Sequence, residues 1–472
     1  MNLKTIKHVH FTGIKGVGMT ALALYFRDMG KTITGSDIEE IFVTDQVLKA
    51  NDINLKIGFG EHNLDSKPDL VICTAAHNGL NNPEVVAAKR FHIPVMTYAE
   101  GLALVSREKK LIATCGVGGK TTTASMIATM LEMSAQDPSY VIGVANINPI
   151  GDAGHYDSRG KYIVAEGDDY AISPGVNNNP KFSLLSPKIL VVHNIAHDHP
   201  DIYKTFSDIK KTFKVFFDKF GRDDVLIASI DNEAVRKLIK GLKAQVITFG
   251  VDKVADYQIK NIRFQSGKTM FAVFDTKQNV FTVDLTMEVP GAYNIHNATA
   301  AYLVGKFLGL ADNKLKHGIE SYKGCKRRFE KIGEYRGATV YDDYAHHPNE
   351  IVEVLEATRA WFPKDRIVAI FQPHTFSRTK ALFSDFAKSF KGADIVGLMD
   401  IYASSREASG VGVSSKLLVK AIKNFNSKTY YLGDHKATLS WLKKNVKKGD
   451  ILLTIGAGDI FRLHKELIPE ST

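Results

Sequence analysis

The sequence predicts an α/β protein of three domains, each built around a mostly parallel sheet. Its 472 residues accommodate about three domains at about 150 residues each. Short runs of β-branched residues alternate with amphipathic stretches, as in parallel strands joined by crossover helices. Glycine-rich or polar clusters follow several of these runs, at the end of a strand where open α/β sheets bind ligands. We place the domains at residues 1–107, 108–325 and 326–472.

The composition is that of a globular chain. Hydrophobic residues make up 44% of the sequence and charged residues 24%, which excludes wholesale disorder and a collagen-like chain. Three scattered cysteines are too few for a disulfide framework or a Cys-rich zinc site. Sixty-one basic residues against 51 acidic ones give a net charge of +10, which admits nucleic acid, an anionic surface or phosphorylated small molecules as partners.

No secretion or membrane segment is expected. The N-terminal residues lack the apolar core of a signal peptide, and no apolar run approaches the roughly 18 residues of a membrane span. We therefore expect a cytoplasmic protein without stable membrane insertion, either a monomer or a homodimer.

The expected elements follow one another as strand and helix in each domain. A helix is predicted at Met19–Met29 and another from about Asn294, and the alternating stretch Met270–Val289 is typical of antiparallel strands. A charged stretch near Arg107 separates the first domain from the second. The predicted strands are His8–Thr12, Lys31–Thr34, Leu70–Cys73, Leu111–Thr114, Tyr162–Ala165, Ile189–Val192, Thr339–Tyr341, Ile367–Ile370 and Ile451–Thr454.

A phosphate-binding loop is predicted at Gly116–Thr123, directly after the strand Leu111–Thr114. A glycine-rich turn between a strand and a helix lets backbone N–H groups face a phosphate at the positive end of the helix. Lys120 would then reach the β and γ oxygens, and the hydroxyl of Thr121 would ligate Mg²⁺. The loop departs from a strict Walker pattern, because Ala113 or Thr114 stands where the first glycine would be.

A second glycine loop follows the first predicted strand. Gly13, Gly16 and Gly18 have the order G-x-x-G-x-G, with Lys15 where a dinucleotide fingerprint has its second glycine. Asp37 ends the next strand, at the place of a ribose-binding acid. A nicotinamide site, a UDP site and tight packing without a ligand all remain open, and the glycine order favours a diphosphate other than a dinucleotide.

Acidic residues that could complete a magnesium site follow the next two strands. Glu166, Asp168 and Asp169 come after Tyr162–Ala165, and Glu166 is the expected metal ligand. The segment Asn194–Asp201, which contains His197, Asp198, His199 and Pro200, follows Ile189–Val192. A magnesium role for His199 is better motivated than a zinc site, because no third strong zinc ligand is evident; solvated loop residues are the alternative for His197 and Asp201.

Later polar motifs each have two interpretations. Asn294 and Asn297 either cap a helix or touch a base. Lys326-Arg327-Arg328 is either a solvated charged run or the source of an arginine on the γ-phosphate. Two further motifs, Asp342–Pro348 and Phe371–Thr379, follow strands of the third domain and carry His with Asp or Arg.

Taken in order, these segments resemble the Mur ligase family across essentially the whole chain. Within the family they are most similar to the members that add L-alanine to UDP-N-acetylmuramate. Asp-Asp-Tyr-Ala-His-His-Pro followed by Phe-Gln-Pro-His is highly specific. The segments that carry the resemblance are Gly13–Met19, Gly35–Asp37, Gly116–Thr123, Glu166–Asp168, Asn194–Asp201, Arg327–Phe329, Asp342–Pro348, Phe371–Thr379, Asp400–Tyr402 and Gly456–Asp459.

The resemblance implies a Rossmann-like domain for the UDP-sugar, a central P-loop domain for ATP with a partly antiparallel sheet, and a C-terminal Rossmann-like domain for the amino acid. ATP would phosphorylate the lactyl carboxylate, and the amine of L-alanine would attack the acyl phosphate. The products would be the amide, ADP and phosphate, a step of peptidoglycan and cell-wall biogenesis.

The resemblance also implies roles for individual residues. The catalytic set would be Lys120, Glu166, His199 and Arg328. Mg²⁺, or Mn²⁺ in its place, would be held by Thr121, Glu166 and His199. ATP would be bound by Gly116, Val117, Gly118, Gly119, Lys120, Thr121, Thr122, Asn294, Asn297, Arg328 and Asp343, with Asp343 at the ribose or the interdomain hinge. The UDP-sugar would be bound by Gly13, Gly16, Val17, Gly18, Ser36, Asp37 and Thr74. The amino acid would be bound by Tyr344, His346, His374 and Arg378.

The chain departs from the family pattern at five positions. The family usually has Thr and His at Val117 and Gly118, an acid at Ala196, and a histidine at Tyr293. Thr375 replaces an arginine, which leaves Arg378 as the expected carboxylate partner and leaves glycine and L-serine open beside L-alanine.

Three other functions are weighed against this prediction. The murein-tripeptide recycling ligase has segments similar to Asp168–Tyr170 and Asp198–Tyr203. The segment Phe371–Arg378 argues against that enzyme. A nicotinamide oxidoreductase leaves the Gly-Gly-Lys-Thr run unexplained. A nucleic-acid-binding module rests on charge alone, so no nucleic-acid partner is expected.

Overall fold

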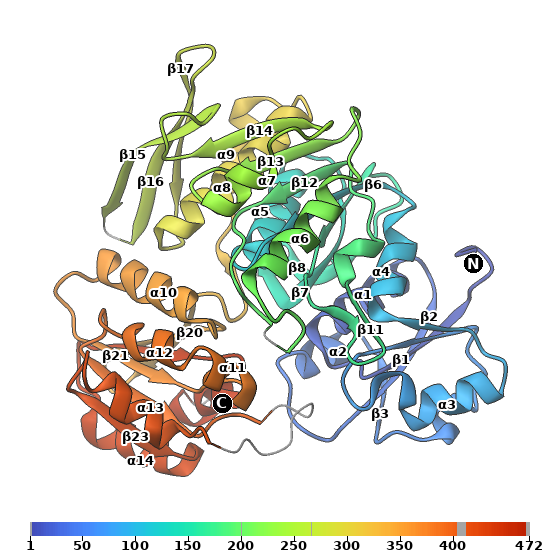
Figure 1. The fold of residues 1–472 in the computed structure, drawn as a ribbon. Helices are drawn as coiled ribbons and strands as arrows, with labels where there is room; N and C mark the ends of the chain where they lie inside the picture. The colour runs from blue at the N-terminus through green and yellow to red at the C-terminus, as the bar shows by residue number, and fades with distance from the viewer. Residues whose placement is uncertain (1, 200, 266, 404–411, 469–472) are drawn as a thin grey trace.

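The computed structural model describes residues 2–199, 201–265, 267–403 and 412–468. It contains three large sheets in sequence order, each with helices packed on it (Figure 1). The N-terminal sheet is blue in Figure 1, the central sheet runs from cyan to yellow-green, and the C-terminal sheet is orange to red. The predicted three-domain α/β architecture is confirmed.

The N-terminal sheet has five strands in the order β3-β2-β1-β4-β5, all parallel. This order is that of a Rossmann-type sheet, as predicted. The predicted strands His8–Thr12 and Leu70–Cys73 coincide with observed strands. The first helix begins at Val17, two residues before its predicted start. The strands are β1 (His8–Thr12), β2 (Thr32–Asp37), β3 (Asn54–Ile57), β4 (Leu70–Cys73) and β5 (Val95–Thr97). The helices are α1 (Val17–Asp28), α2 (Asp45–Ala50), α3 (Pro83–Arg90) and α4 (Tyr98–Ser106).

The central sheet has eleven strands and is parallel in its middle. Strands β14, β13, β12, β6, β9 and β7 pair in parallel, whereas β15, β16 and β17 form the antiparallel extension expected over Met270–Val289. Its strands are β6 (Lys110–Cys115), β7 (Ser139–Asn148), β8 (Gly151–His155), β9 (Tyr162–Glu166), β12 (Ile189–Val192), β13 (Val225–Ser229), β14 (Gln245–Gly250), β15 (Tyr257–Gln265), β16 (Lys268–Asp275), β17 (Val280–Met287) and β18 (Gly324–Cys325). Its helices are α5 (Lys120–Met133), α6 (Phe206–Phe217), α7 (Glu233–Leu238), α8 (Ala292–Phe307) and α9 (Asp312–Glu320). A separate hairpin joins β10 (Ala171–Ser173) to β11 (Asn177–Pro180).

The C-terminal sheet has six strands in the order β19-β20-β24-β21-β22-β23. Only β19 is antiparallel to its neighbour among these strands. The strands are β19 (Glu330–Tyr335), β20 (Ala338–Asp343), β21 (Ile367–Phe371), β22 (Ile395–Met399), β23 (Thr429–Gly433) and β24 (Ile451–Ile455). The helices are α10 (Pro348–Trp361), α11 (Phe376–Ala381), α12 (Phe383–Lys388), α13 (Ser415–Ile422), α14 (His435–Asn445) and α15 (Leu463–Leu467).

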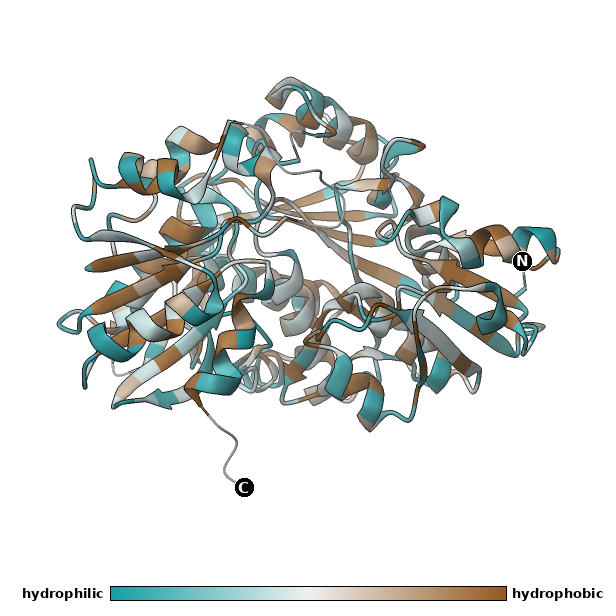
Figure 2. Ribbon diagram, turned by 90° about the horizontal axis from the view of Figure 1, so that it is seen from below, coloured by the Kyte–Doolittle hydropathy of each residue, from teal (hydrophilic) through white to brown (hydrophobic). Residues whose placement is uncertain are grey.

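The strands are apolar and the helices around them present polar outer faces (Figure 2). Strands that are buried on both faces consist of continuous apolar runs. This explains why the sequence predicts β6, β12 and β21. The core of the N-terminal domain is continuous with one face of the central sheet, because α1 joins the two.

Helix α1 packs on β7 and β8 so closely that a side chain is excluded at Gly154. A Cβ atom there would lie 1.8 Å from the carbonyl oxygen of Ala21. His155 also hydrogen-bonds Asp28 at 2.8 Å across the same contact. The N-terminal and central domains therefore form a tightly packed pair.

The C-terminal domain contacts both of the others. The indole N–H of Trp361 donates to Thr269 Oγ1 at 3.3 Å, which joins it to the central sheet. Arg462 donates to Glu40 Oε2 at 3.2 Å, which joins it to the N-terminal domain. Within the described residues, no helix is both long enough and apolar enough to cross a membrane.

Candidate functional site

A cleft of about 1000 Å³ lies where the three domains meet. It opens at the carboxyl ends of β1, β6, β9, β20 and β21, the edge where α/β sheets bind ligands. Most of the predicted site residues line it, which brings all three predicted substrate regions into one space. These are Gly13, Gly16, Val17, Gly18, Asp37, Thr74, Val117, Gly119, Lys120, Thr121, Glu166, His199, Arg328, Tyr344, His346, His374 and Arg378.

The glycine loop between β6 and α5 has the backbone that a phosphate cradle requires. Gly116 and Gly119 have φ angles of +124° and +86°, which side chains rarely allow. A Cβ at Gly116 would lie 2.6 Å from the carbonyl oxygen of Asn194. Lys120 begins α5, and its Nζ donates to the carbonyl oxygens of Gly116 at 2.6 Å and Val117 at 3.3 Å. The ammonium group thus lies folded over its own loop.

Glu166 lies against the first turn of α5. Thr121 Oγ1 donates to Glu166 Oε2 at 2.8 Å, and the Gly143 N–H donates to Oε1 at 2.6 Å. The predicted metal ligands Thr121 and Glu166 are therefore brought together, because β6 and β9 are neighbouring parallel strands.

A second group of ligand atoms lies beside them. Asp168, Asp169 and His199 each bring one ligand atom within 4.8 Å of the others. Asp169 is 1% exposed; its Oδ1 lies 3.3 Å from Lys120 Nζ, and its Oδ2 is buried without a hydrogen-bond partner. Burial opposes ionisation of Asp168, but the charges of Lys181 and Lys120 outweigh it and lower the pKa of that carboxyl. Pro200, in the same motif as His199, lies outside the described residues.

Two adjacent arginines have different surroundings. Arg327 is 6% exposed and donates to Asp342 and to the carbonyl oxygens of Gly456 and Gly458. Both arginines line the cleft, but it is Arg328 whose Nη2 lies 3.5 Å from Thr121 Oγ1 of the central domain. The interpretation of this run as solvated surface charge is wrong for both arginines, since neither is exposed.

Asp343 holds two backbone segments of the C-terminal domain, one of which lies just after its junction with the central domain. Its carboxylate accepts from the N–H of Phe329 at 2.8 Å and of Ala345 at 2.7 Å. Burial raises the pKa of Asp343 to about 6. Of the two predicted roles, this geometry favours the hinge.

Asn294 and Asn297 are buried beneath the phosphate loop. Asn297 Nδ2 donates to Asn294 Oδ1 at 3.0 Å, and Thr123 Oγ1 donates to Asn297 Oδ1 at 3.1 Å. The expectation that these asparagines cap a helix is wrong, because Gly291 is the N-cap of α8. A helix start is hard to fix from sequence when the capping residue is a glycine with positive φ.

The N-terminal loop is held in shape by Asp37. The carboxylate of Asp37 accepts from the N–H of Lys15 at 2.7 Å and of Ile38 at 2.8 Å. The predicted Ser36 is fully buried, and its hydroxyl donates to Glu84 at 2.6 Å. Burial raises the pKa of Asp37, although the two backbone N–H groups act against it.

His77 lines the cleft beside this loop and is not among the site residues predicted from the sequence. Its Nε2 lies 3.5 Å from Asp37 Oδ1, and its ring packs on Phe59 at 5.2 Å. His77 and Asn78 both have positive φ angles, as residues in tight turns do. The Asn-Gly pair at positions 78 and 79 is typical of such a turn. That turn was the available sequence signal.

The predicted amino-acid residues gather around Arg378. Its Nη2 donates to Asp198 Oδ1 at 3.2 Å and its Nη1 lies 3.4 Å from His374 Nδ1. Burial lowers the pKa of His346 to about 4, although Glu350 acts against it. Asp198 and Tyr402, whose ring stacks on His374 at 5.7 Å, were not in the predicted set. Burial opposes ionisation of Asp198, but His199 and Arg378 outweigh it and hold the pKa of its carboxyl low.

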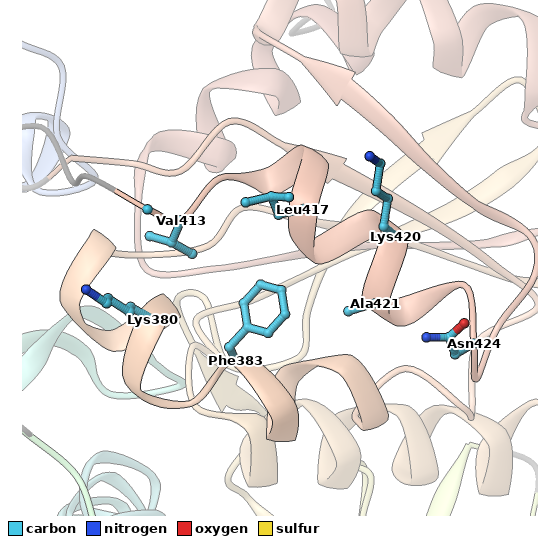
Figure 3. A pocket seen from close by; sticks show the side chains of 8 residues that line it. Lys380, Phe383, Val413, Leu417, Lys420, Ala421 and Asn424 are labelled. Atoms are coloured by element: carbon cyan, nitrogen blue, oxygen red, sulfur yellow. The ribbon is translucent and has the colours of Figure 1, made fainter.

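A smaller hollow of about 460 Å³ lies in the C-terminal domain. Figure 3 shows Phe383 in its middle, Lys380 on one side and Leu417 and Lys420 of α13 on the other. None of the predicted site residues lines this hollow. The three-domain cleft is therefore the candidate active site.

Three family models match consecutive parts of the chain. The model described as Mur ligase family, catalytic domain, matches residues 8–110. The Mur ligase middle domain matches residues 115–305, and the Mur ligase, glutamate ligase domain, matches residues 327–458.

Similar proteins cover almost the whole chain. A UDP-N-acetylmuramate–L-alanine ligase of Desulforamulus reducens is 38% identical over 98% of this chain and 97% of its own. A ligase of the same name from Clostridium acetobutylicum is 37% identical over 97% of this chain and 96% of its own.

Solved structures give the same picture of the fold. The UDP-N-acetylmuramate-alanine ligase of Thermotoga maritima superposes with a TM-score of 0.79 at 25% identity, covering 98% of both chains. A murein peptide ligase of Psychrobacter arcticus, at 21% identity and a TM-score of 0.72 over 98% of both chains, shares the fold.

Proposed function

The chain belongs to the Mur ligase family, and from this premise we propose that it is an ATP-dependent ligase that joins L-alanine to the lactyl carboxylate of UDP-N-acetylmuramate. The observation that carries this function is the single cleft into which the glycine loop after β1, the phosphate loop after β6 and the Arg378 cluster after β21 all open. The product is a peptidoglycan precursor.

The alternatives are less well supported. The full-length relatives at 35–38% identity carry the name of the L-alanine ligase, whereas the likeness to a murein peptide ligase at 21% identity supports a common fold alone. A nicotinamide oxidoreductase has no use for Lys120 and Thr121 at the start of α5.

The nucleotide is assigned to the loop after β6. The N–H groups of Gly116–Thr122 and the ammonium of Lys120 suit the phosphates, and Arg328 suits the γ-phosphate because it lies next to Thr121. We assign Asn294 and Asn297 to the adenine side and Asp343 to the hinge. The UDP group is assigned to the loop at Gly13–Gly18, with Thr74 opposite. The carboxylate of Asp37 holds this loop, and the hydroxyl of Ser36 is bound to Glu84.

The donor set fits a divalent metal ion, Mg²⁺ with Mn²⁺ as a substitute. Thr121 and Glu166 offer oxygen ligands that already lie in contact, and His199 offers a nitrogen, which are donors that such ions take. When bound, the ion would neutralise phosphate charge during transfer.

The residues of the cleft suit transfer through an acyl phosphate. A carboxylate oxygen of the UDP-sugar attacks the γ-phosphorus, and ADP leaves; Lys120 and Arg328 bring positive charge to this meeting of two anions. The amine nitrogen then attacks the acyl carbon, phosphate leaves, and the nitrogen loses a proton. Arg378 suits the carboxylate of the amino acid, and the contact of Arg462 with Glu40 suits a cleft that excludes water from the acyl phosphate.

Each domain is assigned one substrate. We assign residues 1–107, 108–325 and 326–472 to the UDP-sugar, ATP and amino-acid domains. The enzyme works as a monomer or homodimer in the cytoplasm, which supplies the ATP.

The test is phosphate release by the purified chain with substrates omitted one at a time. Release should require UDP-N-acetylmuramate, L-alanine, ATP and Mg²⁺ together, and Lys120→Ala should abolish it. Glycine, L-serine and the murein tripeptide replace L-alanine in parallel reactions; faster ligation of any of these would contradict the assigned amino acid. Lys188→Ala, on an exposed ion pair with Asp224, is the matched control and should retain full activity.

A further inference from the structure

We propose that Asp169 exchanges partners during the reaction. In the nucleotide-free chain it pairs with Lys120, and when the phosphates of ATP take Lys120 it becomes a ligand of a divalent cation together with Asp168 and His199. The inference rests on the proposed ATP-dependent function. It adds Asp168 and Asp169 to the metal ligands expected from the sequence.

The side chain of Asp169 is buried with only half of its carboxylate satisfied. It is 1% exposed; Oδ1 lies 3.3 Å from Lys120 Nζ, and Oδ2 has no hydrogen-bond partner. Its backbone is fixed by the hydroxyl of Tyr203, which donates to the Asp169 carbonyl oxygen at 2.6 Å. A buried ionised oxygen without a partner is costly, so this position calls for a further cation.

The neighbours of Asp169 have the chemistry and spacing of metal ligands. One ligand atom from each of Asp168, Asp169 and His199 lies within 4.8 Å of the other two. An octahedral ion with bonds of about 2.1 Å places adjacent ligands about 3.0 Å apart and opposite ligands about 4.2 Å apart, so a movement of the side chains towards one another closes the set. The ring of His199 is held by packing on Tyr170 at 4.7 Å.

Lys120 cannot serve the nucleotide and Asp169 at the same time. Its Nζ donates to the carbonyl oxygens of Gly116 and Val117, inside the loop that would hold the phosphates. A P-loop lysine bound to ATP reaches the β and γ oxygens. When Lys120 turns to them, Asp169 loses its cationic partner, because the other nearby ammonium, that of Lys181, is bound to Asp168 at 2.7 Å. A buried carboxylate left in this way needs a replacement charge.

The first experiment uses Mn²⁺ alone as the probe, on the nucleotide-free chain, with bound Mn²⁺ measured by electron paramagnetic resonance. Lys120→Met removes the competing ammonium, so it should bind Mn²⁺ about tenfold more tightly than the unmodified chain. Adding Asp169→Asn should cancel that gain. Thermal unfolding of each variant verifies that it is folded. Equal affinity in the unmodified chain and Lys120→Met, or a gain that survives Asp169→Asn, would overturn the exchange.

The second experiment adds a non-hydrolysable ATP analogue and counts Mn²⁺ per chain. Asp169→Asn should hold one ion fewer than the unmodified chain while still binding the analogue. Asp201→Asn is the matched control, because Asp201 is a nearby acid bound to the hydroxyl of Tyr170 at 2.9 Å; its count should not change. An unchanged count in Asp169→Asn overturns the inference and leaves ATP binding intact. Failure of the unmodified chain to bind the analogue contradicts the proposed function, which the Mn²⁺ series without nucleotide does not depend on.

Discussion

Arg327 and Asp342 form a buried ion pair near the carboxyl end of β20 in the C-terminal domain, with Arg327 Nε donating to Asp342 Oδ2 at 2.9 Å. The next residue, Arg328, turns the other way and reaches Thr121 across the cleft. Arg327 is therefore held within the C-terminal domain, whereas Arg328 contacts the central domain.

This difference predicts opposite outcomes for two adjacent substitutions. Arg327→Ala leaves the buried carboxylate of Asp342 without its partner and should lower the free energy of unfolding by about 3–5 kcal/mol. Arg328→Ala should leave that free energy within about 1 kcal/mol and lower kcat about a thousandfold, because a cation on the transferred phosphoryl group is lost. Urea unfolding and phosphate release measure the two effects. Equal losses of stability would contradict the separation.

Glu84 should make the N-terminal domain sensitive to acid. Burial acts against ionisation, but four donors outweigh it and lower the pKa of Glu84 to about 2; they are His10, Ser36, Asn63 and Thr12. The folded pKa is below the unfolded value of 4.5, so the stabilisation is complete above pH 4.5 and is lost as the pH falls towards 2. Glu84→Gln should cost about 3 kcal/mol at pH 7 and flatten this dependence.

Urea unfolding at pH 7 and pH 3 tests this prediction. The control is Glu132→Gln, whose carboxylate has a raised pKa and no such set of donors in the described structure. A variant of Glu84 that keeps the pH dependence of the original chain would show that another group is responsible.

His193 should stay neutral throughout the physiological range. Burial lowers the pKa of His193 to about 3, and its Nε2 lies 2.7 Å from the hydroxyl of Thr123 behind the phosphate loop. The unfolded chain binds this proton below pH 6.5 and the folded chain does not until about pH 3, so His193 lowers stability as the pH falls through that interval. Imidazole resonances in NMR should show no titration of His193 between pH 5 and 8. A midpoint near 6.5 would contradict the buried arrangement.

Arg378 should control the amino-acid substrate. Arg378→Ala should raise KM for L-alanine about a hundredfold and change KM for ATP about twofold or less, because a charged partner of the carboxylate is removed. Lys380→Ala, two residues further on α11 and outside the cleft, is the control and should leave both constants unchanged. A parallel rise in KM for ATP would place Arg378 in general cleft closure instead.

Local motifs were enough to predict much of the fold and the site. The strands β1, β4, β6 and β12 are short apolar runs bounded by turns, and each is followed by its functional loop in the same stretch of sequence. Since parallel strands end at one edge, the clustering of Lys120, Glu166 and His199 could be inferred without coordinates. Long-range pairing could not: β18 is two residues long and pairs with β7 from far away in sequence, a register that no local periodicity reports.

Local motifs identify the family, the three-domain α/β architecture and the order of the two glycine loops, because each of these depends on residues that lie next to one another in the chain. Which polar side chains can meet a ligand depends instead on how distant segments pack together. Asp37 is bound to the glycine loop and Ser36 to Glu84. Arg327 is bound to Asp342 within the C-terminal domain, whereas Arg328 contacts Thr121 across the cleft. The same packing places the unsatisfied oxygen of Asp169 beside Lys120. The partners of a polar side chain are set by burial and by packing between segments that are far apart in the chain. No single stretch of sequence therefore reports which partners a side chain has.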